Sequence, residues 1–167
     1  MSKSTAETNQ EIAYALSNNL SRLLWEFSKD FQYRVLQRTA ARGYPDIRPS
    51  HSKVFSNLGL GAVRVTELAE RAQVTQQAMG KMLKELERLG YVARDVDGGD
   101  KRAKEIRLTP RGVELVSQSL EVVEEVREYY AQRIGEQELA ELESRLRDAV
   151  GKLELDYLPE SWAGQSN

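Results

Sequence analysis

The sequence predicts a mainly α-helical protein with a small two-stranded β-wing: a winged helix-turn-helix between long helices at both chain ends. Three observations support this prediction. Apolar residues recur at helical spacing near both ends of the chain, over residues 11–41 and 113–153. Two short helical segments between them are separated by only two residues. An alternating pair of segments then surrounds a glycine-rich turn. The 167 residues are enough for a single domain, 1–167, with a buried core.

The first predicted helix covers residues 11–41. Gly43 and Pro45 end it, and a short helix follows from Pro49 to Leu58. The apolar positions that define the long helix are Leu16, Leu20, Leu23, Leu24, Phe27, Phe31 and Val35. Together with residues 113–155, this region (11–42) is predicted to dimerise.

The middle of the chain, residues 50–110, contains the predicted helix-turn-helix. Thr66 can cap a helix over 67–72, and Thr75 can cap another over 76–89. Two helices with so short a connection cannot lie antiparallel, which favours a helix-turn-helix. Met79, Met82, Leu83 and Leu86 of the second helix are expected to face the core.

The predicted wing follows directly. Residues 91–94 and 104–108 alternate like two strands around Asp-Gly-Gly-Asp at 97–100. Thr109 and Pro110 are a cap and a first-turn proline, and they open a helix that Gly135 interrupts. A last helix carries Leu139, Leu142, Leu146, Val150 and Leu153.

A helix-turn-helix followed by a glycine-tipped hairpin is typical of winged helices, which place one helix in the DNA major groove. Double-stranded DNA is therefore the expected partner, although an ordinary solvated helix face would show similar polarity. Gly80 favours DNA, because an interior helix glycine costs about 1 kcal/mol and a closely approaching phosphate or helix would explain it. The expected DNA-binding residues are Thr75, Gln76, Gln77, Gly80, Lys81, Lys84, Arg94, Lys101, Arg102 and Lys104.

Within the wing, Asp100 has two interpretations. It can pair with Arg102 and pre-organise that guanidinium for the minor groove, whose negative potential attracts arginine. It can equally form a plain surface salt bridge. The spacing alone is consistent with both.

Composition excludes several classes of function. The chain has no cysteine and only one histidine, so disulfides, iron–sulfur clusters and thiolate zinc sites are excluded, and a histidine-based catalytic pair is not expected. We therefore expect no catalytic residues, no metal and no cofactor, and we expect a protein that is not an enzyme. No apolar run approaches the roughly 18 residues of a membrane span, and no signal peptide is recognisable, so we expect a cytoplasmic protein with no membrane partner.

Charge is distributed unevenly along the chain. Residues 60–112 hold 11 basic and 8 acidic residues, whereas residues 113–167 hold 5 and 13. The terminal helices also carry more apolar positions than a small helix-turn-helix can cover. A two-fold homodimer would cover them and keep the acidic region away from DNA. The alternative is a three-helix bundle within one chain.

The segment Asp100-Lys-Arg-Ala-Lys-Glu-Ile-Arg-Leu-Thr-Pro-Arg-Gly112 resembles the D-x-R...L-T-x-x-G wing signature of the multiple antibiotic resistance regulator (MarR) family. Residues 43–51 and 75–92 are similar to the same family's first inter-helix turn and recognition helix, and the resemblance covers residues 15–155. Gly80 departs from it, since many relatives carry a polar side chain there. The resemblance implies a homodimeric winged-helix transcription factor, often released from DNA by small aromatic compounds.

Sequence and resemblance together predict a transcriptional regulator of repressor type that binds a pseudo-palindromic operator as a homodimer. A helical protein-interaction module without DNA binding is the alternative. A small aromatic ligand would lie between the dimerisation helices and the winged helix. Its candidate residues are Trp25, Tyr33, His51 and Phe55, which core packing explains equally well. His51 can alternatively cap the short helix that it begins.

Overall fold

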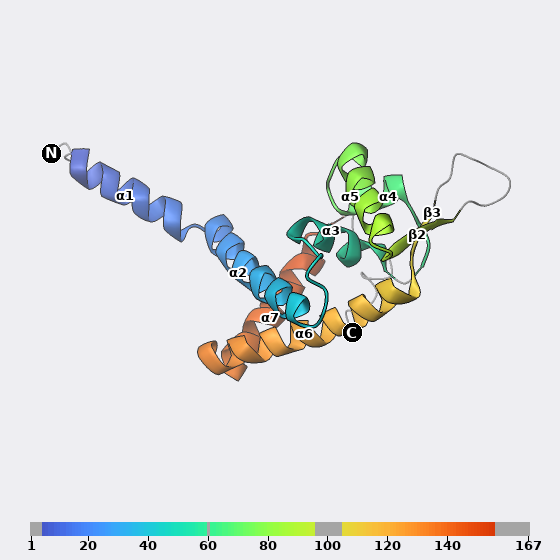
Figure 1. The fold of residues 1–167 in the computed structure, drawn as a ribbon. Helices are drawn as coiled ribbons and strands as arrows, with labels where there is room; N and C mark the ends of the chain where they lie inside the picture. The colour runs from blue at the N-terminus through green and yellow to red at the C-terminus, as the bar shows by residue number, and fades with distance from the viewer. Residues whose placement is uncertain (1–4, 60, 96–104, 156–167) are drawn as a thin grey trace.

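The computed structural model describes residues 5–59, 61–95 and 105–155 of the chain. Its helices and strands follow one another as α1 (Thr5–Asn18), α2 (Leu20–Ala41), α3 (Pro49–Leu58), β1 (Val63–Arg64), α4 (Val65–Arg71), α5 (Gln76–Arg88), β2 (Val92–Asp95), β3 (Glu105–Leu108), α6 (Pro110–Ile134) and α7 (Glu136–Lys152). The prediction of a mainly α-helical winged helix-turn-helix is confirmed (Figure 1).

The sheet contains one strand more than the sequence predicted. β2 and β3 pair antiparallel, with Val92 opposite Leu108 and Asp95 opposite Glu105. β1 adds to the other edge of β3, so that Val63 lies opposite Ile106 and the strand order is β1-β3-β2. A two-residue strand is too short to produce a recognisable alternation, which is why β1 was missed.

The N-terminal helix also differs from the prediction of one helix over 11–41. It begins earlier, at Thr5, and is divided at Asn19 into α1 and α2. The Asn19 side chain accepts a hydrogen bond from the backbone N–H of Arg22 and donates to the carbonyl oxygens of Ala15 and Leu16. One asparagine therefore ends the first helix and caps the second, as its preference for cap positions allows.

The first hydrophobic core lies under the winged helix. α3, α4, α5 and the sheet enclose it, with α6 entering at Leu115. Its fully buried side chains include Val54, Leu58, Leu68, Met79, Leu83, Leu86, Tyr91, Ile106 and Leu115. The core-facing positions expected for the second helix of the helix-turn-helix are thus confirmed, except that Met82 is only partly buried.

The second core forms where α2, α6 and α7 meet (Figure 1). Val122, Val126, Tyr130 and Leu139 are buried there, and Phe27, Phe31, Val35 and Leu142 pack against them. The chain therefore covers part of its terminal apolar surface by itself, as the three-helix alternative expected. Much remains exposed: α1 has no buried residue, and Leu20, Trp25, Leu146, Val150 and Leu153 are exposed. No helix in the described ranges is long and apolar enough to cross a membrane.

Candidate nucleic-acid interface

The outer face of α5 presents polar and basic groups. Met79, Leu83 and Leu86 turn into the first core and fix which face of α5 is outward. The opposite side exposes Thr75, Gln76, Gln77, Lys81 and Lys84, with Gly80 half-buried among them. Thr75 caps the helix, because its hydroxyl accepts a hydrogen bond of 3.1 Å from the backbone N–H of Ala78. This arrangement offers hydrogen-bonding amides and two ammonium groups to an external partner.

Gly80 leaves open space on this face. A Cβ atom added there would meet no heavy atom within 4 Å, so close packing against another part of the described chain does not explain the glycine. The sequence predicted that a phosphate or another helix approaches Gly80. The structure excludes a helix among the described residues of this chain. Approach by an external group, such as a phosphate, remains.

Of the wing residues predicted to bind DNA, the structure describes Arg94 on β2. Its Nε lies 3.1 Å from Oε2 of Glu87 near the end of α5, and this ion pair ties the wing to the helix. The other predicted wing residues, Asp100, Lys101, Arg102 and Lys104, lie outside the described residues. The structure therefore brings Arg94 next to α5, and the roles of Arg102 and Lys104 stay predictions.

Hydrogen bonds and one close backbone contact hold the base of the wing against α6. They involve Gly90, Tyr91, Thr109 and Gly112. The Thr109 hydroxyl donates to the Gly90 carbonyl at 2.6 Å and accepts from the Gly112 N–H at 3.1 Å. The Thr109 N–H donates to the Tyr91 carbonyl at 3.1 Å. A Cβ on Gly112 would stand 2.0 Å from that same carbonyl oxygen. The Thr and Gly of the L-T-x-x-G signature thus hold the wing directly against the start of α6.

Tyr91 also joins a partly buried polar contact that sequence reasoning missed. Its hydroxyl donates to Asp46 Oδ1 at 2.9 Å and accepts from Arg111 Nη2 at 3.2 Å. The Arg111 guanidinium lies 4.6 Å from the centre of the Tyr91 ring. Burial, and then the Asp46 carboxylate, raise the pKa of Tyr91, which keeps the phenol protonated. These three residues connect the α2–α3 turn, the wing and α6.

His51 is completely buried and caps α3, as one of its two predicted roles required. Its Nδ1 accepts a hydrogen bond of 3.2 Å from the Arg48 N–H, so the hydrogen-bond network assigns the proton to Nε2. Nε2 lies 3.2 Å from Glu85 Oε2, and Arg48 Nη1 lies 3.1 Å from Glu85 Oε1. The network therefore locks α3 to the inner side of α5. The hydrogen bond from His51, and the nearby Arg48 charge, lower the pKa of Glu85.

We expect Glu85→Gln to reduce stability at neutral pH and to weaken the acid sensitivity of the fold. Because the folded-state pKa of Glu85 is lowered, its contribution is present above the unfolded value of about 4.3 and is lost as pH falls through the folded value. Melting temperatures at about pH 7 and about pH 3 check this. The drop between them should be smaller in Glu85→Gln than in wild type or in Glu70→Gln, a substitution at an exposed carboxylate of α4. An unchanged drop would contradict the proposed linkage.

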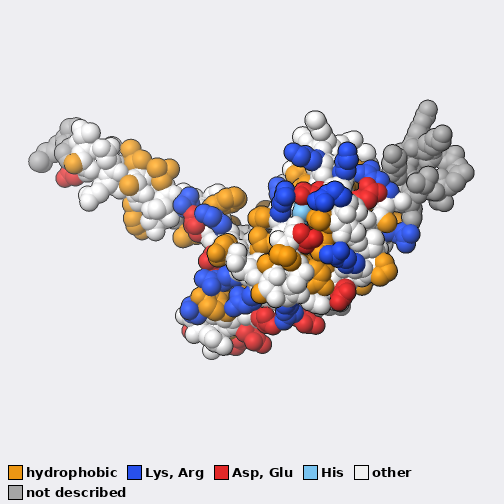
Figure 2. Space-filling model, in the orientation of Figure 1, with side chains coloured by type: hydrophobic (Ala, Val, Ile, Leu, Met, Phe, Trp, Pro, Cys, Tyr) orange, Lys and Arg blue, Asp and Glu red, His pale blue; other side chains and the backbone are white. Residues whose placement is uncertain are grey.

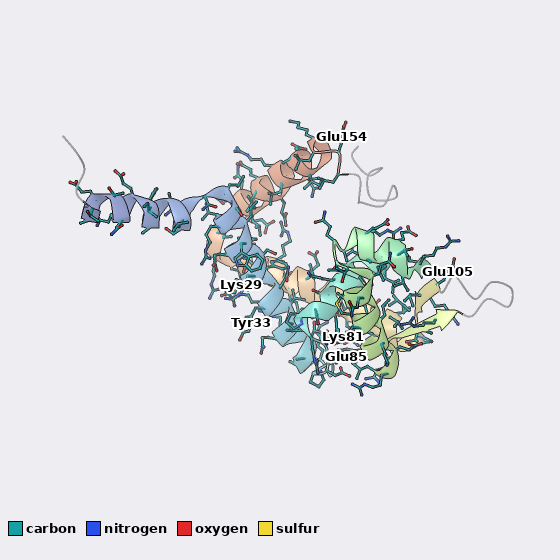
Figure 3. The ribbon with its side chains drawn as sticks, turned by 90° about the horizontal axis from the view of Figure 1, so that it is seen from above. Lys29, Tyr33, Lys81, Glu85, Glu105 and Glu154 are labelled. Carbon is teal, nitrogen blue, oxygen red and sulfur yellow. The ribbon has the colours of Figure 1, made fainter. Side chains whose placement is uncertain are left out.

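The four candidate effector residues occupy two different surroundings. Trp25 and Tyr33 on α2 are 62% and 61% exposed. His51 and Phe55 lie on α3, where the Phe55 ring meets Tyr91 edge-on with centroids 6.4 Å apart. Figure 3 shows Tyr33 on α2, away from Lys81 and Glu85 on α5. Their role in binding a ligand stays a prediction. In the described ranges, no three His, Asp or Glu side chains converge as a metal site.

Comparison with known proteins agrees with this geometry. Residues 46–103, which run from the α2–α3 turn into the wing, match the model described as "MarR family". No curated protein matches the chain significantly.

Solved structures share the fold over most of the chain. The reduced form of MarR from E. coli superposes with a TM-score of 0.69 at 22% identity, covering 78% of this chain and 96% of that one. MepR, a transcription regulator of the Staphylococcus aureus multidrug efflux pump MepA, gives 0.61 at 22% identity, with coverages of 81% and 98%. The transcriptional repressor CouR, bound to a 23-mer DNA duplex, gives 0.67 at 20% identity, with coverages of 81% and 95%. The resemblance is therefore confirmed: the chain has the MarR winged-helix fold, and its residues 46–103 match the MarR family.

Proposed function

We propose that this protein is a DNA-binding transcriptional regulator, of repressor type, that binds a pseudo-palindromic operator as a homodimer. The observation that carries the proposal is the outer face of α5, where exposed amides and lysines surround a glycine with open space above it. Amide and ammonium groups on an exposed helix suit base edges and phosphates in a major groove. The DNA duplex held by CouR, which has the same fold, supports this assignment.

The distribution of charge also supports it. Figure 2 shows many Lys and Arg side chains over α5 and its neighbours, with some Asp and Glu among them, and further Asp and Glu side chains along the lower edge, over α6. DNA binding gains from counterion release wherever cations meet phosphates. The Lys and Arg side chains over α5 can therefore meet the phosphates of the duplex.

The homodimer is supported by the apolar surface that one chain leaves exposed. α1 projects from the body, and its residues Ile12, Tyr14 and Leu16 are each more than half exposed (Figure 1). A lone helix of 14 residues is marginal in water, so α1 needs a covering surface. Leu146, Val150 and Leu153 of α7 form a second exposed apolar group. A two-fold copy would cover both.

A homodimer would place its two α5 helices on inverted half-sites about 34–36 Å apart, one helical turn of DNA. A small aromatic effector that contacts α2 and α3 would release DNA by favouring another spacing of these helices. The fluorescence of Trp25 would report its binding, and quenching without any loss of DNA affinity would contradict that role.

Binding to DNA duplexes selected from a random pool tests the function. Affinity should fall steeply with salt, because phosphate contacts dominate. Lys84→Ala should weaken all duplexes alike and lower the slope of log affinity against log salt by about one. Lys29→Ala is the matched control, because Lys29 is exposed on α2, away from α5 (Figure 3). Absence of salt-dependent binding by the wild type would overturn the proposal.

A further inference from the structure

Three arginines converge on one aromatic ring at the crossing of α2 and α6. Arg34 and Arg38 of α2 and Arg133 of α6 lie 4.2, 5.7 and 3.8 Å from the centre of the Tyr129 ring. We call these three residues the arginine cluster. Three like charges held around one side chain repel one another unless an anion compensates them.

Asp30 of α2 is a carboxylate at this crossing, and it is already engaged. Asp30 Oδ2 accepts from Arg34 Nε at 2.7 Å, and Asp30 Oδ1 accepts from Arg34 Nη2 at 3.3 Å. The Tyr130 hydroxyl also donates to Asp30 Oδ2. Hydrogen bonds from Arg34 and then Tyr130 lower the pKa of Asp30, which keeps it ionised. Asp30 therefore neutralises Arg34 and holds its guanidinium in place.

Arg38 and Arg133 differ from Arg34 in this respect. Within the part of the chain that the structure describes, neither forms an ion pair with a carboxylate. Two nearby arginines, Arg42 directly after α2 and Arg127 on α6, do have carboxylate partners. Arg42 pairs with Glu121 and Glu125, and Arg127 pairs with Glu136 and Glu143. The arginine cluster thus carries about two uncompensated positive charges although carboxylates are abundant on α6 and α7.

The Tyr129 ring that the arginine cluster surrounds is itself packed against other aromatic rings. The Tyr129 ring meets Tyr130 edge-on, with centroids 5.6 Å apart. Tyr130 is 9% exposed and stacks on Phe31 at 5.6 Å. Guanidinium groups held by ring stacking lose little freedom when they bind a planar or tetrahedral oxyanion, and arginine matches such anions with paired N–H donors.

We propose that the arginine cluster is a binding site for the oxyanion of a small molecule, a phosphate or a carboxylate, held chiefly by Arg38 and Arg133. The site is separate from the DNA-binding face. Tyr129 follows Pro110 by 19 residues, which places it about 28 Å along α6 from the end that holds the wing. The proposal therefore does not rest on the proposed function.

Titration calorimetry of the full chain with inorganic phosphate, against a chloride buffer of equal ionic strength and without DNA, tests the site. Wild type should bind saturably, and Arg38→Gln and Arg133→Gln should each weaken binding about tenfold, the typical loss for one charge-assisted hydrogen bond. Arg145→Gln should bind like wild type, because Arg145 is 81% exposed on α7. Circular dichroism should show unchanged helix content in all three variants.

Two results would overturn the proposal. One is the absence of saturable binding of phosphate, and likewise of malonate as a dicarboxylate probe, to the wild type. The other is binding that survives in the Arg38→Gln, Arg133→Gln double variant. In one such case no small anion binds, and the double variant is monomeric where the wild type is dimeric. Carboxylates of a second copy then occupy the cluster, and the small-molecule proposal is wrong. Retained DNA binding in the double variant would separate this outcome from failure of the proposed function.

Discussion

Gly112→Ala is expected to lower the free energy of unfolding by about 3 kcal/mol, the upper part of the usual range for overpacking a tight site. The added Cβ would stand 2.0 Å from the Tyr91 carbonyl oxygen, which is backbone and cannot rotate away. Relief requires α6 to move from the wing, and this would break the Thr109 hydrogen bonds to Gly90 and Tyr91. Chemical denaturation of the purified variant measures the change.

Gly80→Ala is the matched control for this prediction. Both glycines lie in helices, but a Cβ on Gly80 meets nothing within 4 Å. The substitution should therefore raise the free energy of unfolding by up to about 1 kcal/mol, the difference in helix propensity. The same variant should bind DNA more weakly if a phosphate or base edge approaches that space. Equal stability effects at the two glycines would contradict the close contact at Gly112.

Leu146→Asp combined with Val150→Asp is expected to disrupt the homodimer and to weaken DNA binding strongly. Both side chains are exposed on α7 in the single chain, at 39% and 43%, so the substitutions leave the second core intact. In a homodimer they would bury two unpaired carboxylates in each subunit. The dimer should then dissociate, so that each molecule binds DNA with a single α5 helix. DNA affinity should fall by roughly 100-fold or more, since bivalent binding adds at least that factor.

Light scattering and a DNA-binding titration check this prediction together. Ser144→Asp is the control, because it adds a charge to an exposed position on another face of α7. Leu142 is unsuitable for the test, since it packs within the chain against the second core. A doubly substituted protein that remains dimeric with unchanged affinity would show that α7 is not part of the dimer interface.

Local sequence signals determined most of the fold. The two-residue connection at Gln73 and Val74, the caps at Thr75 and Thr109, and the apolar spacing of α5 and α6 each depend on residues within a few positions. Such signals are readable without the rest of the chain, because hydrogen bonding in a helix and the facing of its side chains are local. Polarity on the outer face of α5 follows from the same periodicity, so the candidate interface on that helix was predictable.

Other features needed contacts between distant residues. Asn19 shows the intermediate case, because its preference for a cap was visible but the helical spacing around it favoured continuation. The pairing of β1 with β3 joins residues more than 40 positions apart, and a two-residue strand has no pattern of its own. The contact of His51 with Glu85 likewise spans 34 positions.

The sequence by itself determined the helix-turn-helix, the wing, the outward face of α5 and the uneven charge along the chain. The tertiary structure alone decided that Gly112 presses on the Tyr91 carbonyl and that Gly80 faces open space. It also decided that Arg38 and Arg133 both lie against the Tyr129 ring, with no described carboxylate in an ion pair with either. The physical reason is the distance along the chain over which each kind of interaction acts. Propensity and periodicity act over one or two helical turns, whereas close contacts and charge compensation depend on where separate elements cross.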